Sequence, residues 1–286
     1  MFTWHTRTFI MGILNITPDS FSGDGLWHEG DVIAAAAAQA QQFVADGADI
    51  LDIGAESTRP GSTPVTAKEE LARVIPIVKA VRPVVPVPIS IDTYRAEVAR
   101  AALDAGANWV NDVWGLRMDD QMARLVAERG CPVVIMHNRS QPKDAHQEER
   151  LGGRYVGVHY DDLFEDITRE LQASIALAHT AGIKDEQIIL DPGIGFGKTV
   201  PQNLQLLNGI HHFKSLGYPL LIGASRKSFI GYTLDLPPDE RVEGTAATVA
   251  IAIARGADII RVHDVKVMAR VAKMTDAIVK GLSEKD

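Results

Sequence analysis

TFIMGILN (Thr8–Asn15) is a short apolar run that ends in a polar residue, and a long polar connection follows it. Seven more runs of this kind follow, separated by segments with helical periodicity. Short apolar runs rich in β-branched residues that alternate with helices predict a parallel sheet, and eight of them predict an α/β fold of the (β/α)₈ barrel type. The other runs are ILDIGAE (Ile50–Glu56), VPISID (Val87–Asp92), WVND (Trp109–Asp112), PVVIMH (Pro132–His137), IILD (Ile188–Asp191), PLLIGASRK (Pro219–Lys227) and IIRVH (Ile259–His263).

Helical segments fill the gaps between these runs, and several of them end at a glycine that can cap a helix C-terminus. No linker, low-complexity tract or block of charge divides the chain, and barrels commonly reach roughly 250 residues as one unit. Residues 1–286 are therefore expected to form a single domain. The expected helices are Asp31–Asp46, Ala67–Val81, Arg95–Ala105, Asp119–Arg129, Asp161–Thr180, Pro201–Phe213, Gly244–Ala254 and Val265–Lys280.

Composition excludes several functional classes. The chain has 286 residues, is 46% hydrophobic and carries a formal net charge of −8, which argues against a nucleic-acid partner. No apolar run approaches the ~20 residues of a transmembrane helix, and the N-terminal residues lack the features of a secretory signal. The single cysteine, Cys131, excludes an intramolecular disulfide and fits a reducing compartment. A cytoplasmic protein without a membrane partner is expected.

In a (β/α)₈ barrel, the C-terminal strand ends share one mouth, where the active site lies. Three long connections follow strand ends and are expected to overhang this mouth: Ile16–Gly30, Ser57–Thr66 and Asn138–Tyr160. The Asn138–Tyr160 stretch is highly polar, and a surface excursion is the favoured interpretation of it.

Carboxylates end two of the strands, at Asp92 and Asp191. One interpretation is a surface-loop carboxylate or a helix N-cap. The other is an acceptor for a planar heterocycle rich in N–H groups, since one carboxylate can take two parallel hydrogen bonds. In WVND, Asn111 and Asp112 point to opposite faces of the strand, so only one can line the barrel interior, and alternation does not say which.

Positive charge gathers after the last two strands, where many barrels bind phosphate. Arg226 and Lys227 lie in SRKS, and Arg261 and His263 lie in RVH. Scattered surface cations are the alternative. Asn15 could add a neutral oxygen ligand for Mg²⁺, which usually arrives with substrate phosphate, but capping of the loop backbone explains this residue equally well.

The segment DPGIGFGKT (Asp191–Thr199) superficially resembles a phosphate-binding loop. The pattern GxxxxGK[ST] requires a glycine where this chain has Pro192, and GxGxxG fails at Lys198. These glycines instead favour a close approach of the backbone and of Phe196 to a ligand.

Taken together and in order, eight segments resemble the motifs of the dihydropteroate synthase family, and they cover essentially the whole chain. The resemblance implies a (β/α)₈ barrel that condenses 6-hydroxymethyl-7,8-dihydropterin diphosphate with p-aminobenzoate in folate biosynthesis. The segments are GILNITPDSFSGDG (Gly12–Gly25), GAESTRPG (Gly54–Gly61), SIDTYR (Ser90–Arg95), NDVWG (Asn111–Gly115), MH (Met136–His137), ILDPGIGFGK (Ile189–Lys198), GASRKSFIG (Gly223–Gly231) and IIRVHDV (Ile259–Val265).

The resemblance also implies roles for individual residues. The positions that match pterin-ring ligands are Asp92, Asn111, Asp191 and Lys227, with Met136 packed against the ring. Those that match the diphosphate site are Asn15, Arg261 and His263, with Asn15 also associated with Mg²⁺. Those that fall in segments expected to form the p-aminobenzoate pocket are Thr58, Arg59, Pro60, Phe196 and Ser228. The implied catalytic set is Lys227, Asp191, Arg261, His263 and Asp92.

One departure from the family pattern lies in the first loop, which has SFSGDG (Ser20–Gly25) where many members have SFSDGG. The second acid of this motif is therefore shifted by one position, to Asp24. The family commonly forms homodimers. Alternative functions are a pterin-dependent methyltransferase on a related barrel and a non-catalytic pterin-binding protein.

Overall fold

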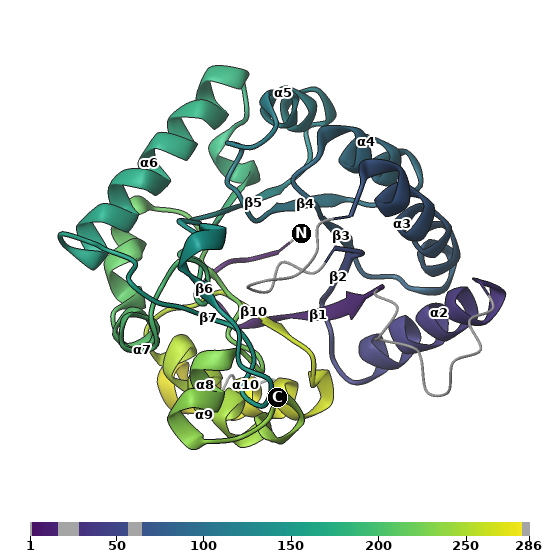
Figure 1. Ribbon diagram of the computed structural model, residues 1–286. Helices are drawn as coiled ribbons and strands as arrows, with labels where there is room; N and C mark the ends of the chain where they lie inside the picture. The colour runs from purple at the N-terminus through teal and green to yellow at the C-terminus, as the bar shows by residue number, and fades with distance from the viewer. Residues whose placement is uncertain (1, 17–28, 57–64, 282–286) are drawn as a thin grey trace.

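Eight parallel strands form one sheet, and their order around the sheet follows the chain (Figure 1). The computed structural model describes residues 2–16, 29–56 and 65–281. β1 pairs with both β2 and β10, and a bridge between Leu190 and Leu220 closes the ring between β8 and β9. The predicted barrel is confirmed. Its strands are β1 (Phe9–Asn15), β2 (Ile50–Gly54), β3 (Ile89–Asp92), β4 (Trp109–Asp112), β5 (Val133–Met136), β8 (Ile188–Asp191), β9 (Leu221–Ile222) and β10 (Ile259–Val262).

Helices surround the sheet on its outer face (Figure 1). They are α2 (Glu29–Ala45), α3 (Ala67–Val81), α4 (Ala96–Asp104), α5 (Asp120–Arg129), α6 (Leu163–Ala181), α7 (Val200–Asn208), α8 (Ser228–Leu234), α9 (Val242–Ala254) and α10 (Val265–Lys280).

Two predicted elements differ from those observed. The run Pro219–Lys227 contains only a two-residue strand, and the helix α8 directly after it was not predicted. The predicted helix Pro201–Phe213 ends early, because Gly209 caps α7 and a 3₁₀ turn, Ile210–Leu216, follows.

Local sequence signals start and stop several helices. α3 and α7 begin with capping boxes, in which Thr66 and Thr199 accept from the third helical residue and that residue's side chain accepts in return. α5 and α6 end at Gly130 and Gly182, both left-handed.

The alternation of each strand divides its side chains between two cores. One set faces the helices, and the other fills the barrel interior near the N-terminal strand ends. The interior apolar set is Phe9, Met11, Ile50, Trp109, Val134, Ile189, Leu221 and Ile259. The aromatic residues Phe2 and Trp4 pack below it, with the Phe2 ring 5.3 Å from that of Trp109. This end is sealed by apolar packing, so polar chemistry is confined to the opposite mouth.

The connection after β5 contains a short antiparallel hairpin, β6 (Ala145–His146) and β7 (Arg154–Tyr155). The prediction that this connection is a surface loop is wrong at its two ends. Asn138 and Tyr160 are buried there and form hydrogen bonds with the segments that follow β4 and β8. Within the described residues, no helix is both long enough and apolar enough to cross a membrane.

Candidate active site

A polar layer lies above the apolar barrel interior, on the inward face of β2, β3, β4 and β10. Arg261 Nε lies 2.6 Å from Asp52 Oδ2, and Arg261 Nη2 lies 2.7 Å from Asp92 Oδ2. Asn111 Nδ2 donates to the same Asp52 oxygen at 3.0 Å. Asp52 is fully buried, whereas the Arg261 side chain keeps 20% of its surface exposed. The guanidinium therefore compensates two carboxylates while still facing the mouth.

The structure also distinguishes Asn111 from Asp112. Asn111 faces the barrel interior through its bond to Asp52. Asp112 points outward and accepts from the backbone N–H groups of Trp114 and Leu116, both at 2.8 Å. Burial raises the pKa of Asp112 to about 6, although these two bonds oppose the rise. Asp112 therefore shapes the turn after β4, and Asn111 is the polar side chain that β4 presents to the mouth.

Lys227 lies across the mouth, at the start of α8. Its Nζ donates to Ile194 O and lies 4.5 Å above the centre of the Phe196 ring. Asp191 Oδ1 accepts from Gly193 N at 2.7 Å, and its negative charge favours the Lys227 ammonium. Met136 is buried at the end of β5, beside Asp191 in the sheet register. These contacts place one cation, one carboxylate and one aromatic ring together.

The four basic residues after β9 and β10 do not act as one cluster. Arg226 pairs with Asp264, its Nε 2.8 Å from Oδ2, and its charge is therefore already balanced. His263 Nδ1 lies 3.0 Å from Ser225 Oγ. Of these four residues, Lys227, Arg261 and His263 stay at the mouth, and Arg261 does so with its side chain partly exposed although it is paired with Asp52 and Asp92.

The remaining predicted positions are placed as follows. Asn15 ends β1 and is partly exposed, and Ser228 is the first residue of α8. Phe196 is partly exposed in the loop after β8. The predicted positions outside the described residues are Thr58, Arg59 and Pro60, together with Asp24 in the first loop.

Asp52 was missed by the sequence analysis, although a carboxylate inside the apolar run ILDIG requires a buried partner and is a signal in itself. Its second oxygen, Oδ1, and the neighbouring Ser90 Oγ are buried, with no hydrogen-bond partner among the described residues. Asp52 Oδ1 and Ser90 Oγ can therefore each still form a hydrogen bond beneath the polar layer.

Burial tunes the ionisable groups of this layer. It raises the pKa of Asp92 to about 7, with Asp52 adding to the rise and Arg261 opposing it. Burial raises the pKa of Asp191 as well, against the charge of Lys227. In the same way, burial lowers the pKa of Lys227 to about 8, with Asp191 opposing. Perturbed ionisable groups gathered at the C-terminal strand ends of a barrel are typical of a catalytic site.

This barrel, with a polar mouth that combines carboxylates, an amide and cations, defines a ligand-binding enzyme of the TIM-barrel class. Residues 11–263 match the model of the family described as "Pterin binding enzyme". A dihydropteroate synthase from Clostridium beijerinckii is 49% identical over 275 residues, which cover 96% of this chain and 95% of that protein.

Solved structures agree with the sequence comparison. A dihydropteroate synthase from Clostridium difficile, in the presence of pteroic acid, has a TM-score of 0.87 at 47% identity and covers 97% of this chain and 99% of its own. One from Xanthomonas albilineans, with 4-aminobenzoic acid, has a TM-score of 0.86 at 40% identity and covers 97% and 94%. The chain belongs to the dihydropteroate synthase family of pterin binding enzymes.

Proposed function

We propose that this chain condenses 6-hydroxymethyl-7,8-dihydropterin diphosphate with p-aminobenzoate, giving 7,8-dihydropteroate and diphosphate in folate biosynthesis. The observation that carries the proposal is the polar layer of Asp92, Asn111 and Arg261 opposite Lys227 and Asp191. A pterin ring carries N–H donors and acceptors along its edge, and carboxylates, an amide and an ammonium are complementary to them.

The pterin is bound by the ring-facing residues Asp92, Asn111, Asp191 and Lys227, with Met136 as apolar packing. Three of these groups hold charges that burial disfavours, because the pKa values of Asp92 and Asp191 are raised and that of Lys227 is lowered. A ligand that forms hydrogen bonds with these buried charged groups would offset part of the free-energy cost of their desolvation. The site is therefore expected to bind the ring with high specificity.

The reaction exchanges one bond at the pterin methylene carbon. The C–O bond to diphosphate breaks and its electron pair leaves on the diphosphate, while the amine nitrogen of p-aminobenzoate forms the new C–N bond and loses a proton. Arg261 and His263 stabilise the charge that develops on the leaving diphosphate. Asp191 lies close to Lys227 and stabilises positive charge that develops on the pterin. No strong base is required, because the electrophile is a cation.

The described residues fit a Mg²⁺ ion that arrives with the substrate. Asn15 offers one amide oxygen at the mouth, and no group of three or more His, Cys, Asp or Glu side chains is placed to hold a metal within residues 2–16, 29–56 and 65–281. Mg²⁺ commonly binds through one or two protein oxygens together with substrate phosphates and waters. When bound, it would neutralise charge on the diphosphate.

The second substrate, p-aminobenzoate, is assigned to the side of the mouth formed by Phe196, Lys227 and Ser228. Phe196 offers an aromatic face, and Ser228 offers a hydroxyl for the carboxylate of the substrate. The other positions proposed for this pocket, Thr58, Arg59 and Pro60, lie outside the described residues.

The decisive assay incubates the purified protein with the pterin diphosphate, p-aminobenzoate and Mg²⁺. Diphosphate release that depends on p-aminobenzoate is expected. Release without this dependence would refute the condensation, and pterin binding without turnover would favour a non-catalytic pterin-binding protein. Methyl transfer from methyl-tetrahydrofolate to a corrinoid partner would instead favour the methyltransferase.

Pterin binding is expected to weaken as the pH falls through about 7, because an ionised Asp92 accepts the N–H groups of the ring. Calorimetry with 6-hydroxymethylpterin, which lacks the titrating diphosphate, should give a Kd about 20-fold higher at pH 5.5 than at pH 7.5. The variant Asp92→Asn should bind weakly at both pH values. A wild-type Kd that does not change over this range would contradict the role of Asp92.

Three broader features complete the proposal. Residues 1–286 act as one pterin-binding domain, and the buried free Cys131 is compatible with the reducing cytoplasm. A homodimer is proposed because seven of the eleven exposed large apolar side chains among the described residues lie on the neighbouring helices α7 to α10, and exposed apolar surface can mark an association surface. Sedimentation of the purified protein should give twice the monomer mass. The exposed side chains are Leu204, Leu234, Ile251, Val267, Met274, Ile278 and Val279.

A further inference from the structure

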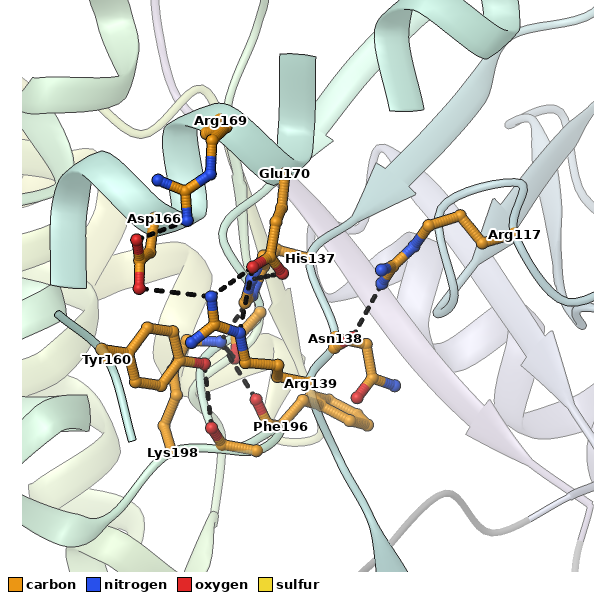
Figure 2. A network of polar contacts seen from close by, with 12 residues as sticks. Arg117, His137, Asn138, Arg139, Tyr160, Asp166, Arg169, Glu170, Phe196 and Lys198 are labelled. Carbon is orange, nitrogen blue, oxygen red and sulfur yellow. Dashed lines mark hydrogen bonds and ion pairs between the residues drawn. The ribbon is translucent and has the colours of Figure 1, made fainter. Parts of the chain in front are cut away.

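A buried lysine lies beside the proposed site but is not part of it. Lys198 Nζ lies 3.0 Å from His137 Nδ1 and donates to Gly193 O at 2.9 Å and to Phe196 O at 3.0 Å. The whole side chain is buried. Figure 2 shows these contacts as part of a polar network that extends from the loop after β8 to α6. Burial lowers the pKa of Lys198 well below its usual value, so this amine is held by its three hydrogen-bond contacts and not by an ion pair.

The hydrogen bonds define the protonation state of His137. Its Nε2 lies 2.9 Å from Glu170 Oε2, so Nε2 carries the proton, which it donates to the carboxylate. The lone pair on Nδ1 then accepts from Lys198. Burial, followed by the charge of Lys198, lowers the pKa of His137 to about 3, so the ring stays neutral. Glu170, His137 and Lys198 therefore form a directed chain of donors and acceptors.

The far end of this chain is anchored on α6 (Figure 2). Arg139 Nε donates to Glu170 Oε1 at 3.0 Å, and the guanidinium also contacts Asp166 and lies 4.2 Å above the Tyr160 ring. Burial alone would raise the pKa of Glu170, but the bonds from His137 and Arg139 lower it to about 2. Glu170 is thus ionised and cannot release His137 at ordinary pH.

Lys198 contacts a loop whose backbone packs closely against the segment after β5 at Gly193 and Gly197. Gly193 has φ +73°, and a Cβ there would lie 1.8 Å from His137 O. Gly197 has φ +59°, and a Cβ there would lie 2.4 Å from the Arg139 backbone. Tyr160 also holds this loop, by donating its OH to Gly197 O at 2.9 Å. Two glycines in left-handed conformations thus allow the loop to pack directly on the segment after β5.

The opposite side of the same loop faces the mouth. On that side, Lys227 Nζ donates a hydrogen bond to Ile194 O and lies over the Phe196 ring. The loop is therefore held between two lysines: Lys198 from behind and Lys227 from the site. Loss of the rear contact would free the carbonyl of Phe196 and allow its ring to move.

We propose that Lys198, oriented by His137 and Glu170, is a positioning residue for the second substrate: it fixes Phe196 against Lys227 and so shapes the p-aminobenzoate side of the mouth. This proposal rests on the function proposed above. The pterin-facing residues Asp92, Asn111 and Arg261 are held by bonds to Asp52 and to one another, which do not involve this loop. Loss of Lys198 should therefore affect the two substrates unequally.

The first test is Lys198→Met, which keeps the length of the side chain and removes its three donors. The KM for p-aminobenzoate should rise at least about tenfold, as loss of preorganised geometry can cost up to 10²-fold. The Kd of 6-hydroxymethylpterin, measured by calorimetry, should rise by a clearly smaller factor, because Asp92, Asn111 and Arg261 are held outside this loop and only Asp191 and Lys227 contact it. Equal weakening of both ligands, or an unchanged KM, would overturn the positioning role.

Arg82→Met is the matched control. Arg82 is also a cation that donates to a backbone carbonyl, that of Val85, and to the side chain of Asn108, which in turn accepts from the backbone N–H of Ile89 where β3 begins, at the opposite end of the barrel. The Arg82→Met variant should have a changed Tm, but the ratio of its KM for p-aminobenzoate to its Kd for 6-hydroxymethylpterin should equal the wild-type ratio. A rise in the KM for p-aminobenzoate in this variant as well would show that the effect comes from general destabilisation.

A second pair of variants decides the question if Lys198→Met does not fold. Gln can accept from Lys198 and donate to Glu170, as the neutral His137 ring does, so His137→Gln should retain most of the affinity for p-aminobenzoate. His137→Leu can do neither and should raise that KM. An equal KM for p-aminobenzoate in the two variants would refute the proposal that His137 orients Lys198. The wild-type protein, assayed in parallel, separates the two hypotheses: its inactivity would refute the proposed function, whereas its activity with unchanged KM values in all variants would refute only the role of Lys198.

Discussion

Lys227→Met is expected to lower kcat/KM by about 10²–10³-fold, the usual loss when one preorganised charged donor is removed from a site. Lys227, at the start of α8, contacts Ile194 O and the Phe196 ring in the loop after β8 and interacts with Asp191 at the end of β8. Methionine keeps the stem and its packing. The loss should therefore reflect the missing ammonium, measured by steady-state diphosphate release.

The fold of this variant should survive. Burial lowers the pKa of Lys227 to about 8, which means that the native state disfavours the ammonium relative to the unfolded chain below its ordinary pKa of 10.5. Removal of the ammonium relieves this penalty but also removes the main charge that compensates Asp191, and because these two effects oppose each other the net change in Tm should be small. A large fall in Tm, or full activity, would contradict the assigned role.

Arg226→Met is the control for this variant, because Arg226 is the preceding residue and also a cation. Its charge is already paired with Asp264. Exposed or half-exposed ion pairs contribute about 0–1 kcal/mol, so turnover should stay within about fivefold of wild type. A loss as large as that of Lys227→Met would mean that positive charge in this segment, rather than Lys227 itself, controls the reaction.

The barrel and most of its mouth could be predicted from sequence, because each strand leaves a local signal. Alternation places Arg261 and His263 on one face, and strand-end polarity marks Asp92 and Asp191. The helix α8 could not be predicted in this way. This helix has seven residues and begins directly after Lys227, so it is too short to show a separate segment of helical periodicity.

The supporting contacts depend on long-range packing and leave weaker signals. Asp52 meets Arg261 across 209 positions of the chain, and alternation alone does not pair them. Lys198 and His137 are in contact although 61 positions separate them in the chain. The sequence around Lys198 shows only that it does not match a phosphate-binding loop. The side chains proposed to touch substrate lie at strand ends, where the sequence pattern reveals them, whereas their supporting contacts form only in the closed barrel.

Arg261→Met is expected to reduce both stability and activity. Arg261 compensates Asp52, which is fully buried, and Asp92, which is nearly so. Removal of one partner from a buried ionic group typically costs about 3–5 kcal/mol, because the remaining charge has no compensation. Thermal unfolding should show a Tm lower by roughly 6–15 °C. Turnover should fall at least about 10²-fold, since the diphosphate loses its guanidinium donor.

The double variant Asp52→Asn with Arg261→Met separates these two losses. Asparagine removes one uncompensated carboxylate and can still accept from Asn111, so part of the lost Tm should return. Activity should not return, because the charge that faces the diphosphate is still missing. Recovery of both would mean that Arg261 serves only as a counterion. Recovery of stability alone would separate its two tasks: one bond to Asp52 that holds the barrel mouth together, and one charge directed at the leaving group.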